Sequence, residues 1–325
     1  MDRPGHSPDI AGYLTHLQTQ RQLSAHTLDN YRRDLEQLAS LAAEQSQTST
    51  LEALTTADIR RYAGQLHARG LAPTSIARKL SAWRTFFSWL AEELGLPVNP
   101  VIGVKPPRRA KPLPKALGVD DAVRLVSNTP IFAPLKAASA RCSKAVFELL
   151  YSCGLRVSEL TCLDLRYVKT EGYESRGWID LDAAEVIVTG KGNKRRSVPV
   201  GTAAVAALRD WLAVRAELTQ PARHADEQAL FLSARGHRIS PREVQKRIKA
   251  HAQALGIPAD VHPHMLRHSF ASHVLQSSGD LRAVQEMLGH ASIASTQVYT
   301  SLDFQRLAQV YDAAHPRAKK QRDSS

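Results

Sequence analysis

The chain has 325 residues, of which 43% are hydrophobic and 23% are charged, a composition typical of a globular protein that buries a core. Its 43 lysines and arginines outnumber its 31 aspartates and glutamates and leave a formal net charge of +12, which suits a polyanionic partner such as nucleic acid. This length exceeds what one hydrophobic core usually holds, so two domains are expected.

Cysteine usage and hydropathy exclude several classes of protein. Cys142, Cys153 and Cys162 have no CxxC spacing, so we expect neither a disulfide framework nor a zinc site, and this favours a reducing compartment. The start MDRPGHSPDI lacks the apolar core of a signal peptide, and no run of about 18 uncharged apolar residues follows. The sequence therefore predicts a cytoplasmic protein without membrane insertion.

The first part of the chain predicts an all-helical domain. Apolar residues recur at helical spacing in four stretches, 10–20, 28–38, 58–68 and 76–90. Ser24 is the expected cap of the second helix, and Gly95 the expected end of the fourth. We expect the aromatic residues of the fourth stretch in the core. The polar faces carry basic side chains that either face solvent or contact DNA: Arg32, Arg33, Arg60, Arg61, Arg78, Lys79 and Arg84.

The clearest domain boundary is GVKPPRRAKPLPK at residues 103–115, which is rich in proline and basic residues and has no acid. Because proline removes a backbone donor and disrupts helices, this stretch predicts an extended linker. It is either simply solvated or lies along DNA phosphates. The expected domains are therefore residues 1–102 and 116–325, joined by this linker.

After the linker the pattern is mixed. Two alternating stretches, 185–189 and 196–200, flank a GKGN turn and predict a β-hairpin with Lys191 at its tip. Ser240 and Glu243 form a capping-box pattern that begins a helix at Pro241. Further helices are expected over 145–153, which Gly154 ends, and over 265–276, 281–288 and 304–312. The last residues, PRAKKQRDSS, predict disorder.

Six residues of the second domain form a chemically coherent set. Two arginines, a lysine and two histidines can neutralise a phosphate while a phenol attacks it. The set consists of Arg156, Lys191, His264, Arg267, His290 and Tyr299.

The layout of this set resembles that of the tyrosine recombinase family. The motifs are GLR at 154–156, TGKGNK at 189–194, HPHMLRH at 262–268, LGH at 288–290 and QVYT at 297–300. His264 and Arg267 match the family's HxxR, and the intervals to His290 and Tyr299 fit. The stretch 277–320 is similar to the end of the bacterial Xer recombinases, most of all to their XerC branch. The resemblance implies an all-α, SAM-like core-binding N-terminal domain and an α+β catalytic domain whose C-terminal helix is exchanged between protomers.

The resemblance assigns the chemistry of phosphoryl transfer. Arg156 and Arg267 would bind the scissile phosphate, because guanidinium is planar, bidentate and always charged. Tyr299 would be the nucleophile and form a 3′-phosphotyrosyl link, so neither ATP nor any other cofactor or metal is expected. A free phenol has a pKa near 10, so the attack requires a base or a strongly cationic setting.

The remaining roles fall on histidines and a lysine. His264 is the candidate that assists the tyrosine, His290 would hydrogen-bond the phosphate, and Lys191 would protonate the departing 5′-oxygen. Lys194 is the nearest rival of Lys191. Three other histidines lie near enough in sequence to be mistaken for the functional ones: His262, His268 and His273.

Two features depart from the Xer pattern. The interval from Arg156 to Lys191 is longer than expected by about ten residues, and the extra length lies in VKTEGYESRGWIDLD at 168–182, which a surface insertion would explain. Position 301 is serine, where related sequences often carry histidine. Neither departure touches the six residues.

The resemblance implies a site-specific recombinase that acts on double-stranded DNA at a dif-like site. Its expected partner is XerD, in a heterotetramer with two copies of each protein, and a DNA translocase would act on the complex while chromosome or plasmid dimers are resolved at cell division. The alternatives are a XerD-type enzyme or a phage or integron integrase. Less favoured are a noncatalytic DNA-binding protein, which the six competent residues argue against, and a type IB topoisomerase.

Overall fold

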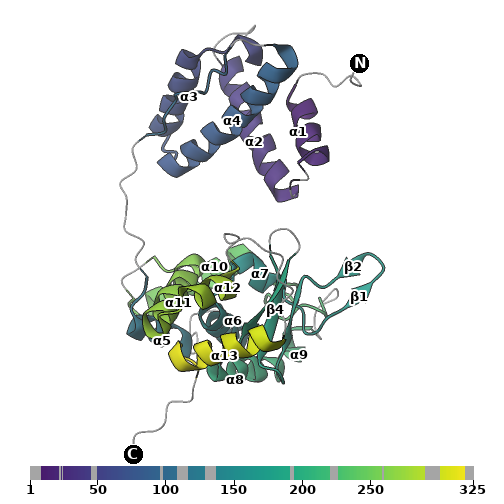
Figure 1. Ribbon diagram of the computed structural model, residues 1–325, viewed down its shortest axis with the longest axis vertical. Helices are drawn as coiled ribbons and strands as arrows, with labels where there is room; N and C mark the ends of the chain where they lie inside the picture. Colours follow the sequence, from purple (N-terminus) through teal and green to yellow (C-terminus); the bar gives the residue numbers. More distant parts are fainter. Residues whose placement is uncertain are drawn as a thin grey trace, which may run out of the picture. The chain divides into compact units, whose positions relative to one another are not determined.

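The chain folds into two compact units, Met1–Pro112 and Leu113–Ser325. The division falls inside the proline-rich stretch 103–115 (Figure 1). The computed structural model describes, in residue numbers, 9–21, 23, 25–44, 50–95, 98–107, 116–128, 137–190, 194–219, 226–257, 260–289 and 301–318, with the backbone alone for 25–26 and 301–305.

The N-terminal unit is helical, as predicted. Its four α-helices are α1 (Ile10–Thr19), α2 (Ala25–Ala43), α3 (Thr56–Ala68) and α4 (Pro73–Leu94), with a short 3-10 turn at Leu51–Ala53. Asp9 caps α1, a Thr55–Asp58 capping box starts α3, and Gly95 ends α4 in the left-handed region at φ +65°. Ser24, the expected cap of α2, lies outside the described residues. The aromatic residues of α4 form the centre of the core, as expected: Trp83, Phe86, Phe87 and Trp89.

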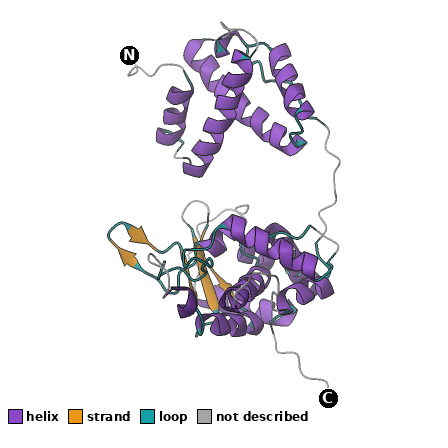
Figure 2. Cartoon of the chain, turned by 180° about the vertical axis from the view of Figure 1, so that it is seen from behind, coloured by secondary structure: helices purple, strands orange, loops and turns teal. Residues whose placement is uncertain are grey.

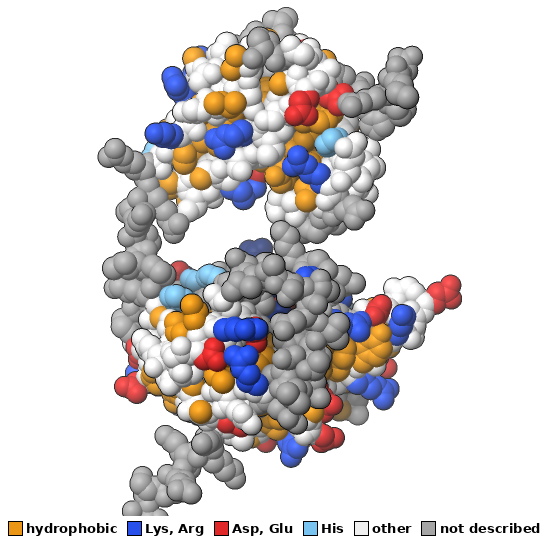
Figure 3. All heavy atoms as spheres, viewed as in Figure 1, with side chains coloured by type: hydrophobic (Ala, Val, Ile, Leu, Met, Phe, Trp, Pro, Cys, Tyr) orange, Lys and Arg blue, Asp and Glu red, His pale blue; other side chains and the backbone are white. Residues whose placement is uncertain are grey.

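One residue of the expected basic face proves to be internal. Lys79 is buried, and its Nζ lies 2.8 Å from Oδ1 of the buried Asp34, which also pairs with Arg78. Trp83 donates its indole N–H to the Asp34 carbonyl at 2.8 Å. The expectation that Lys79 faces solvent or DNA is therefore wrong, because a buried lysine is stable only when paired. Lysine and arginine side chains are scattered over the visible face of this unit (Figure 3).

The C-terminal unit packs helices around a small antiparallel sheet (Figure 2). The strands are β1 (Lys169–Thr170), β2 (Tyr173–Glu174), β3 (Gly177–Asp180), β4 (Glu185–Thr189) and β5 (Arg195–Pro199). The helices are α5 (Val119–Ser127), α6 (Ala137–Cys153), α7 (Val157–Thr161), α8 (Thr202–Leu212), α9 (Ala216–Thr219), α10 (Pro241–Ala254), α11 (Pro263–Ser278), α12 (Leu281–Leu288) and α13 (Ser301–Ala314).

The predicted hairpin is confirmed as β4 and β5, with Thr189 opposite Arg195. A third strand, β3, pairs with the outer side of β4, and β1 pairs with β2 as a separate two-stranded arm. These three strands come from the segment 168–182, for which the sequence predicted only an insertion. The Ser240 side chain caps α10 through the Glu243 N–H, but the Glu243 carboxylate pairs with Arg247, so only half of the predicted capping box forms.

The C-terminal helix α13 packs on its own unit, against α11 and β5. Leu307 and Tyr311 are buried, while the side chain of Phe304 lies outside the described residues. The Tyr311 hydroxyl lies 2.6 Å from the Ser152 hydroxyl inside the core, and Arg317, just after the helix, pairs with the buried Glu148. The three cysteines are free, and none of the described helices is long and apolar enough to cross a membrane.

Candidate active site

The site begins at the end of α6, where a glycine permits a sharp change of direction. Gly154 has φ +57°, and a Cβ at this position would lie 2.4 Å from the Phe270 ring, so both conformation and space require glycine. Two residues later Arg156 precedes the first turn of α7. The Glu159 carboxylate accepts the backbone N–H of Arg156 at 2.8 Å and thereby caps this short helix.

Glu159 organises three arginines. Its carboxylate accepts Nη1 of Arg156 at 2.8 Å and both terminal nitrogens of Arg196 at 2.9 Å. Nη1 of Arg267 lies 3.9 Å away. Although burial alone would raise the pKa of Glu159, its hydrogen bonds to Arg196 and Arg156 and the charge of Arg196 hold this pKa below its ordinary value. Glu159 is therefore a charged carboxylate at neutral pH, surrounded by guanidinium groups.

Arg267 is fixed by backbone carbonyls. It lies on the first turns of α11, is buried, and donates to the Gly154 carbonyl at 2.6 Å and to the Leu288 carbonyl at 2.7 Å. Burial, and next the charge of Arg156, lower the pKa of Arg267 to about 10, so it stays charged at neutral pH. The two carbonyls stand at the ends of α6 and α12, so the fold orients this guanidinium before any phosphate arrives.

Arg196 secures the end of α12 from the sheet side. Its Nε donates to the Met287 carbonyl at 3.0 Å, while its terminal nitrogens hold Glu159. Gly289 follows at φ +65°, and a Cβ there would come within 3.0 Å of Arg196. Two arginines thus satisfy carbonyls at the C-terminus of α12, where the helix dipole favours positive charge.

His264 lies on the first turn of α11 and is exposed. Its ring stacks on His262, with centroids 6.4 Å apart and planes at 11°. Partial burial, followed by the charges of His262, Arg267, His268 and Arg156, lowers the pKa of His264. A neutral imidazole at physiological pH is the form that can accept a proton.

Three of the six predicted residues are therefore brought to one place: Arg156, His264 and Arg267. The other three, Lys191, His290 and Tyr299, lie outside the described residues. Their neighbours are described, since Gly190 and Lys194 close the β4–β5 stem and Gly289 ends α12.

The structure also separates rivals from candidates. The His262 side chain caps α11 by accepting the Met265 N–H at 3.2 Å, and His273 is buried between the Tyr151 hydroxyl and the Leu117 carbonyl. Tyr311, another tyrosine near the end of the chain, is buried, and burial raises its pKa well above the ordinary value. Each of these side chains has a structural role.

Glu159 and Arg196 were not singled out from the sequence. Glu159 follows Arg156 at the i+3 spacing of a capping residue, which is a signal that could have been noticed. Arg196 stands in a run, KRRSVP, in which nothing distinguishes it from its neighbours. Their importance comes from burial and pairing, which depend on the tertiary fold.

The cluster carries an excess of positive charge. Three guanidinium groups face the single carboxylate of Glu159, and the Arg156 side chain is 43% exposed, so it can meet a ligand from solvent. Fixed donors around an excess of positive charge stabilise a phosphate as charge builds on its oxygens. Within the described residues, no group of three metal-ligating side chains could hold a metal ion.

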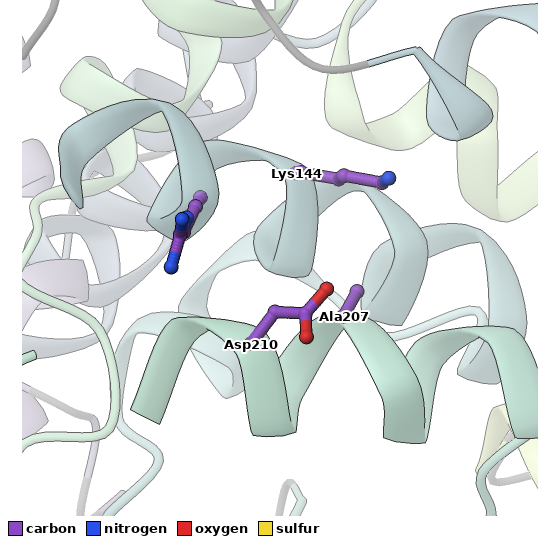
Figure 4. A pocket seen from close by; sticks show the side chains of 4 residues that line it. Lys144, Ala207 and Asp210 are labelled. Atoms are coloured by element: carbon purple, nitrogen blue, oxygen red, sulfur yellow. The ribbon is translucent and has the colours of Figure 1, made fainter. Parts of the chain in front are cut away.

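A separate hollow of about 240 Å³ lies between α6 and α8 (Figure 4). Arg141, Lys144, Ala207 and Asp210 line it. None of the six predicted residues takes part in it, and its small size and mixed charge give it no evident chemistry.

Comparisons with known proteins identify the family of the chain. The profile of the Phage integrase family matches residues 116–306, and that of the Phage integrase N-terminal SAM-like domain matches residues 10–93. A protein named tyrosine recombinase XerC from Ralstonia pickettii (strain 12J) is 58% identical over 96% of this chain and 95% of its own. A protein of the same name from Alcanivorax borkumensis is 47% identical over 99% of both chains.

Two solved structures share the fold. The XerH site-specific recombinase bound to a palindromic difH substrate has a TM-score of 0.63 at 19% identity, over 94% of this chain and 84% of that one. The Tn1549 transposon integrase in complex with transposon right end DNA has a TM-score of 0.63 at 16% identity, over 91% and 97%.

Proposed function

Because this chain belongs to the phage integrase family, we propose that it is a site-specific tyrosine recombinase of the XerC type that cleaves and rejoins double-stranded DNA. The observation that carries the proposal is the arginine cluster, in which Arg156 and Arg267 share the Glu159 carboxylate. High identity to relatives named XerC over nearly the whole chain supports the type.

The proposed reaction is a phosphoryl transfer to tyrosine. The Tyr299 hydroxyl attacks the scissile phosphate, so that a bond forms between the phenolic oxygen and phosphorus while the bond to the 5′-oxygen breaks. Arg156 and Arg267 stabilise the non-bridging oxygens. The 3′-phosphotyrosyl link conserves the energy of the broken bond, and attack by a 5′-hydroxyl reverses the step when the strands rejoin.

Protons move through the other three residues. His264, whose pKa is lowered by partial burial and then by its cationic neighbours, accepts the phenolic proton, and His290 donates a hydrogen bond to the phosphate. Lys191 gives a proton to the departing 5′-oxygen. Two positions in the sequence support these roles: Lys191 lies between β4 and β5, and His290 directly follows α12. Arg196 connects the two places, because it belongs to β5 and donates to the Met287 carbonyl of α12.

The domain roles follow the same proposal. Residues 1–102 form a DNA-gripping domain, 103–115 a basic linker, and 116–325 the catalytic domain with a C-terminal exchange helix. The division of the chain inside this linker and the net charge of +12 support it. The solved relatives bound to DNA support a double-stranded DNA partner.

The proposal also assigns the chain a biological role and partner proteins. The chain would act in the cytoplasm at a dif-like site with XerD, two copies of each in a heterotetramer that a DNA translocase activates, and resolve chromosome or plasmid dimers. The names of the relatives support the XerC type, whereas the XerD partner, the stoichiometry and the translocase rest on the family resemblance.

A nicked suicide substrate tests the enzyme assignment. Cleavage next to a nick releases a short DNA strand, so the covalent protein–DNA adduct accumulates and is visible by denaturing electrophoresis. The unmodified chain and the Tyr311→Phe control should form the adduct, whereas Tyr299→Phe should bind the DNA without forming it. Adduct formation by Tyr299→Phe would refute the assignment, and its absence in all three proteins would favour a noncatalytic DNA-binding protein.

A further inference from the structure

The segment 168–182 forms an arm, β1 and β2, that projects beside β4 (Figure 1) and then returns as β3. It has no part in the proposed chemistry. Its contacts nevertheless converge on Arg195, the first residue of β5.

The Arg195 side chain is exposed, but two rings and a carboxylate contact its guanidinium group. Its guanidinium carbon lies 5.3 Å from the centroid of the Tyr167 ring and 5.5 Å from that of Trp178. Glu174 on β2 accepts a hydrogen bond from Arg195 and another, at 3.0 Å, from the Tyr167 hydroxyl. We call Tyr167, Glu174 and Trp178 the brace. Cation–π contact and a charge-assisted hydrogen bond act on the same guanidinium, which restricts it more than a lone surface ion pair does.

The arm is hydrogen-bonded to the core, so it can restrict the position of the Arg195 side chain that it contacts. The Tyr173 hydroxyl donates to the fully buried Asp164 at 2.7 Å, and Arg238 donates to the other oxygen of this carboxylate at 2.6 Å. The Ser175 hydroxyl accepts the Val168 N–H at 2.9 Å and closes the base of the arm. The brace is thus attached to the rest of the unit on both sides of β1 and β2.

Arg195 stands at the stem of the hairpin that carries Lys191. It pairs with Thr189 across β4 and β5, and the Gly190 N–H bonds the Lys194 carbonyl at 2.8 Å. Side chains alternate along a strand, so Arg195 and Arg196 leave β5 on opposite faces. Arg196 holds Glu159 while Arg195 is held by the brace, so the start of β5 is fixed from both sides.

We propose that the brace is a positioning device for the general acid: by fixing Arg195, it sets the stem from which Lys191 reaches the leaving 5′-oxygen. This inference rests on the proposed function, in particular on the role of Lys191. Tyr167, Glu174 and Arg195 are positioning residues and touch no substrate in this role. The insertion is thereby more than a tolerated surface loop.

The test compares leaving groups. Two nicked suicide substrates are made, one with oxygen and one with sulfur at the 5′-bridging position, because a thiolate leaves without needing a proton. Single-turnover cleavage is measured for Tyr167→Ala, which removes one ring of the brace from an exposed site, and for Tyr167→Phe, which keeps the ring. Glu171→Gln, at the exposed tip of the arm, is the matched control, and Lys191→Ala calibrates the loss of the acid.

The expected pattern is selective rescue. Tyr167→Ala should cleave the oxygen substrate about tenfold more slowly than the unmodified chain, because a displaced general acid loses only part of its roughly 100-fold or larger rate contribution. It should cleave the sulfur substrate within about twofold of the unmodified rate. Tyr167→Phe and Glu171→Gln should stay within about twofold on both substrates.

Other outcomes are equally clear. If sulfur rescues Lys191→Ala while Tyr167→Ala is slow on both substrates, or normal on both, the brace does not act through the acid and the inference is wrong. If sulfur does not rescue Lys191→Ala, the proposed role of Lys191 fails, and the inference falls with it.

Discussion

Replacing Glu159 by glutamine tests whether the arginine cluster depends on one buried charge. Glutamine has nearly the same shape, but it is neutral and presents an N–H₂ group where Arg196 or Arg156 now finds an acceptor oxygen. Because Arg196 is about 5% exposed, it cannot turn to water for compensation. The substitution therefore leaves a buried guanidinium without its counter-ion.

The expected cost is large. Removing one partner of a buried ion pair typically destabilises a protein by about 3–5 kcal/mol, and Glu159 also loses its charge-assisted hydrogen bond to the Arg156 N–H, which caps α7. We expect Glu159→Gln to lower the free energy of unfolding of the catalytic unit by about 3 kcal/mol or more. If Arg156 and Arg267 bind the phosphate as proposed, the cleavage rate should also fall, because both guanidinium groups lose the carboxylate that they share.

Urea denaturation of the full chain, followed by tryptophan fluorescence, measures this cost; Trp178 and Trp211 report on the catalytic unit. The control is Glu286→Gln, whose carboxylate pairs with Arg282 at the surface of α12 and should contribute less than about 1 kcal/mol. A loss below about 1 kcal/mol for Glu159→Gln would refute the view that this carboxylate holds the cluster together.

The difference in stability between the unmodified chain and Glu159→Gln should depend on pH. Since the pKa of Glu159 in the folded chain lies below its ordinary value of 4.5, its carboxylate stabilises the fold fully above that value. The contribution is lost as pH falls through the lower, folded pKa. The difference in stability between the unmodified chain and Glu159→Gln should therefore be constant near neutrality and shrink below about pH 4.5.

Two further substitutions address the proton acceptor and the turn. Because the pKa of His264 is lowered from 6.5, the single-turnover cleavage rate should be flat from pH 8 to 6.5 and fall only below pH 6.5. The His264→Ala variant should be slower by about 100-fold and should lack this decline. A decline in the rate of the unmodified chain already between pH 8 and 7 would contradict the role of His264 as proton acceptor. Gly154→Ala would combine a left-handed backbone with a 2.4 Å contact to Phe270 and should destabilise by about 2–4 kcal/mol in urea. Gly70→Ala, at φ +85° with open space around the added Cβ, should cost only about 1 kcal/mol, and equal costs would mean that the Phe270 contact is unimportant.

The N-terminal helices and several later ones were predictable, whereas α5, α7, α8 and α9 were not expected from the sequence. In α4, the apolar spacing and the glycine at its end both follow from local rules, and the structure matches them. The strands β1 and β2 were missed because each is only two residues long and exposes both side chains, so they carry no alternation to detect. Lys79 was misjudged because its burial depends on Asp34, a partner 45 positions away in sequence.

The site divides in a similar way. Arg156, His264 and Arg267 could be chosen from their motifs, since the chemistry of phosphate transfer requires cations and a proton acceptor at those positions. Glu159 and Arg196 could not, because a charged residue in a short helix or strand is usually a solvated one. Only the fold shows that both are buried and that the ends of α7 and α12 meet there.

The way in which the arginines are held has a consequence for catalysis. Cations placed close together repel each other, and here backbone carbonyls at the ends of α6 and α12, together with Glu159, offset this repulsion before DNA binds. The donors therefore need little reorganisation when a phosphate arrives, which is the condition under which electrostatic stabilisation of a transition state is most effective. Under the proposed mechanism, small displacements of these helix ends would move the arginines that contact the phosphate. In sequence, His290 directly follows the last described residue of α12, Gly289, and Lys191 lies four residues before Arg195, the first residue of β5.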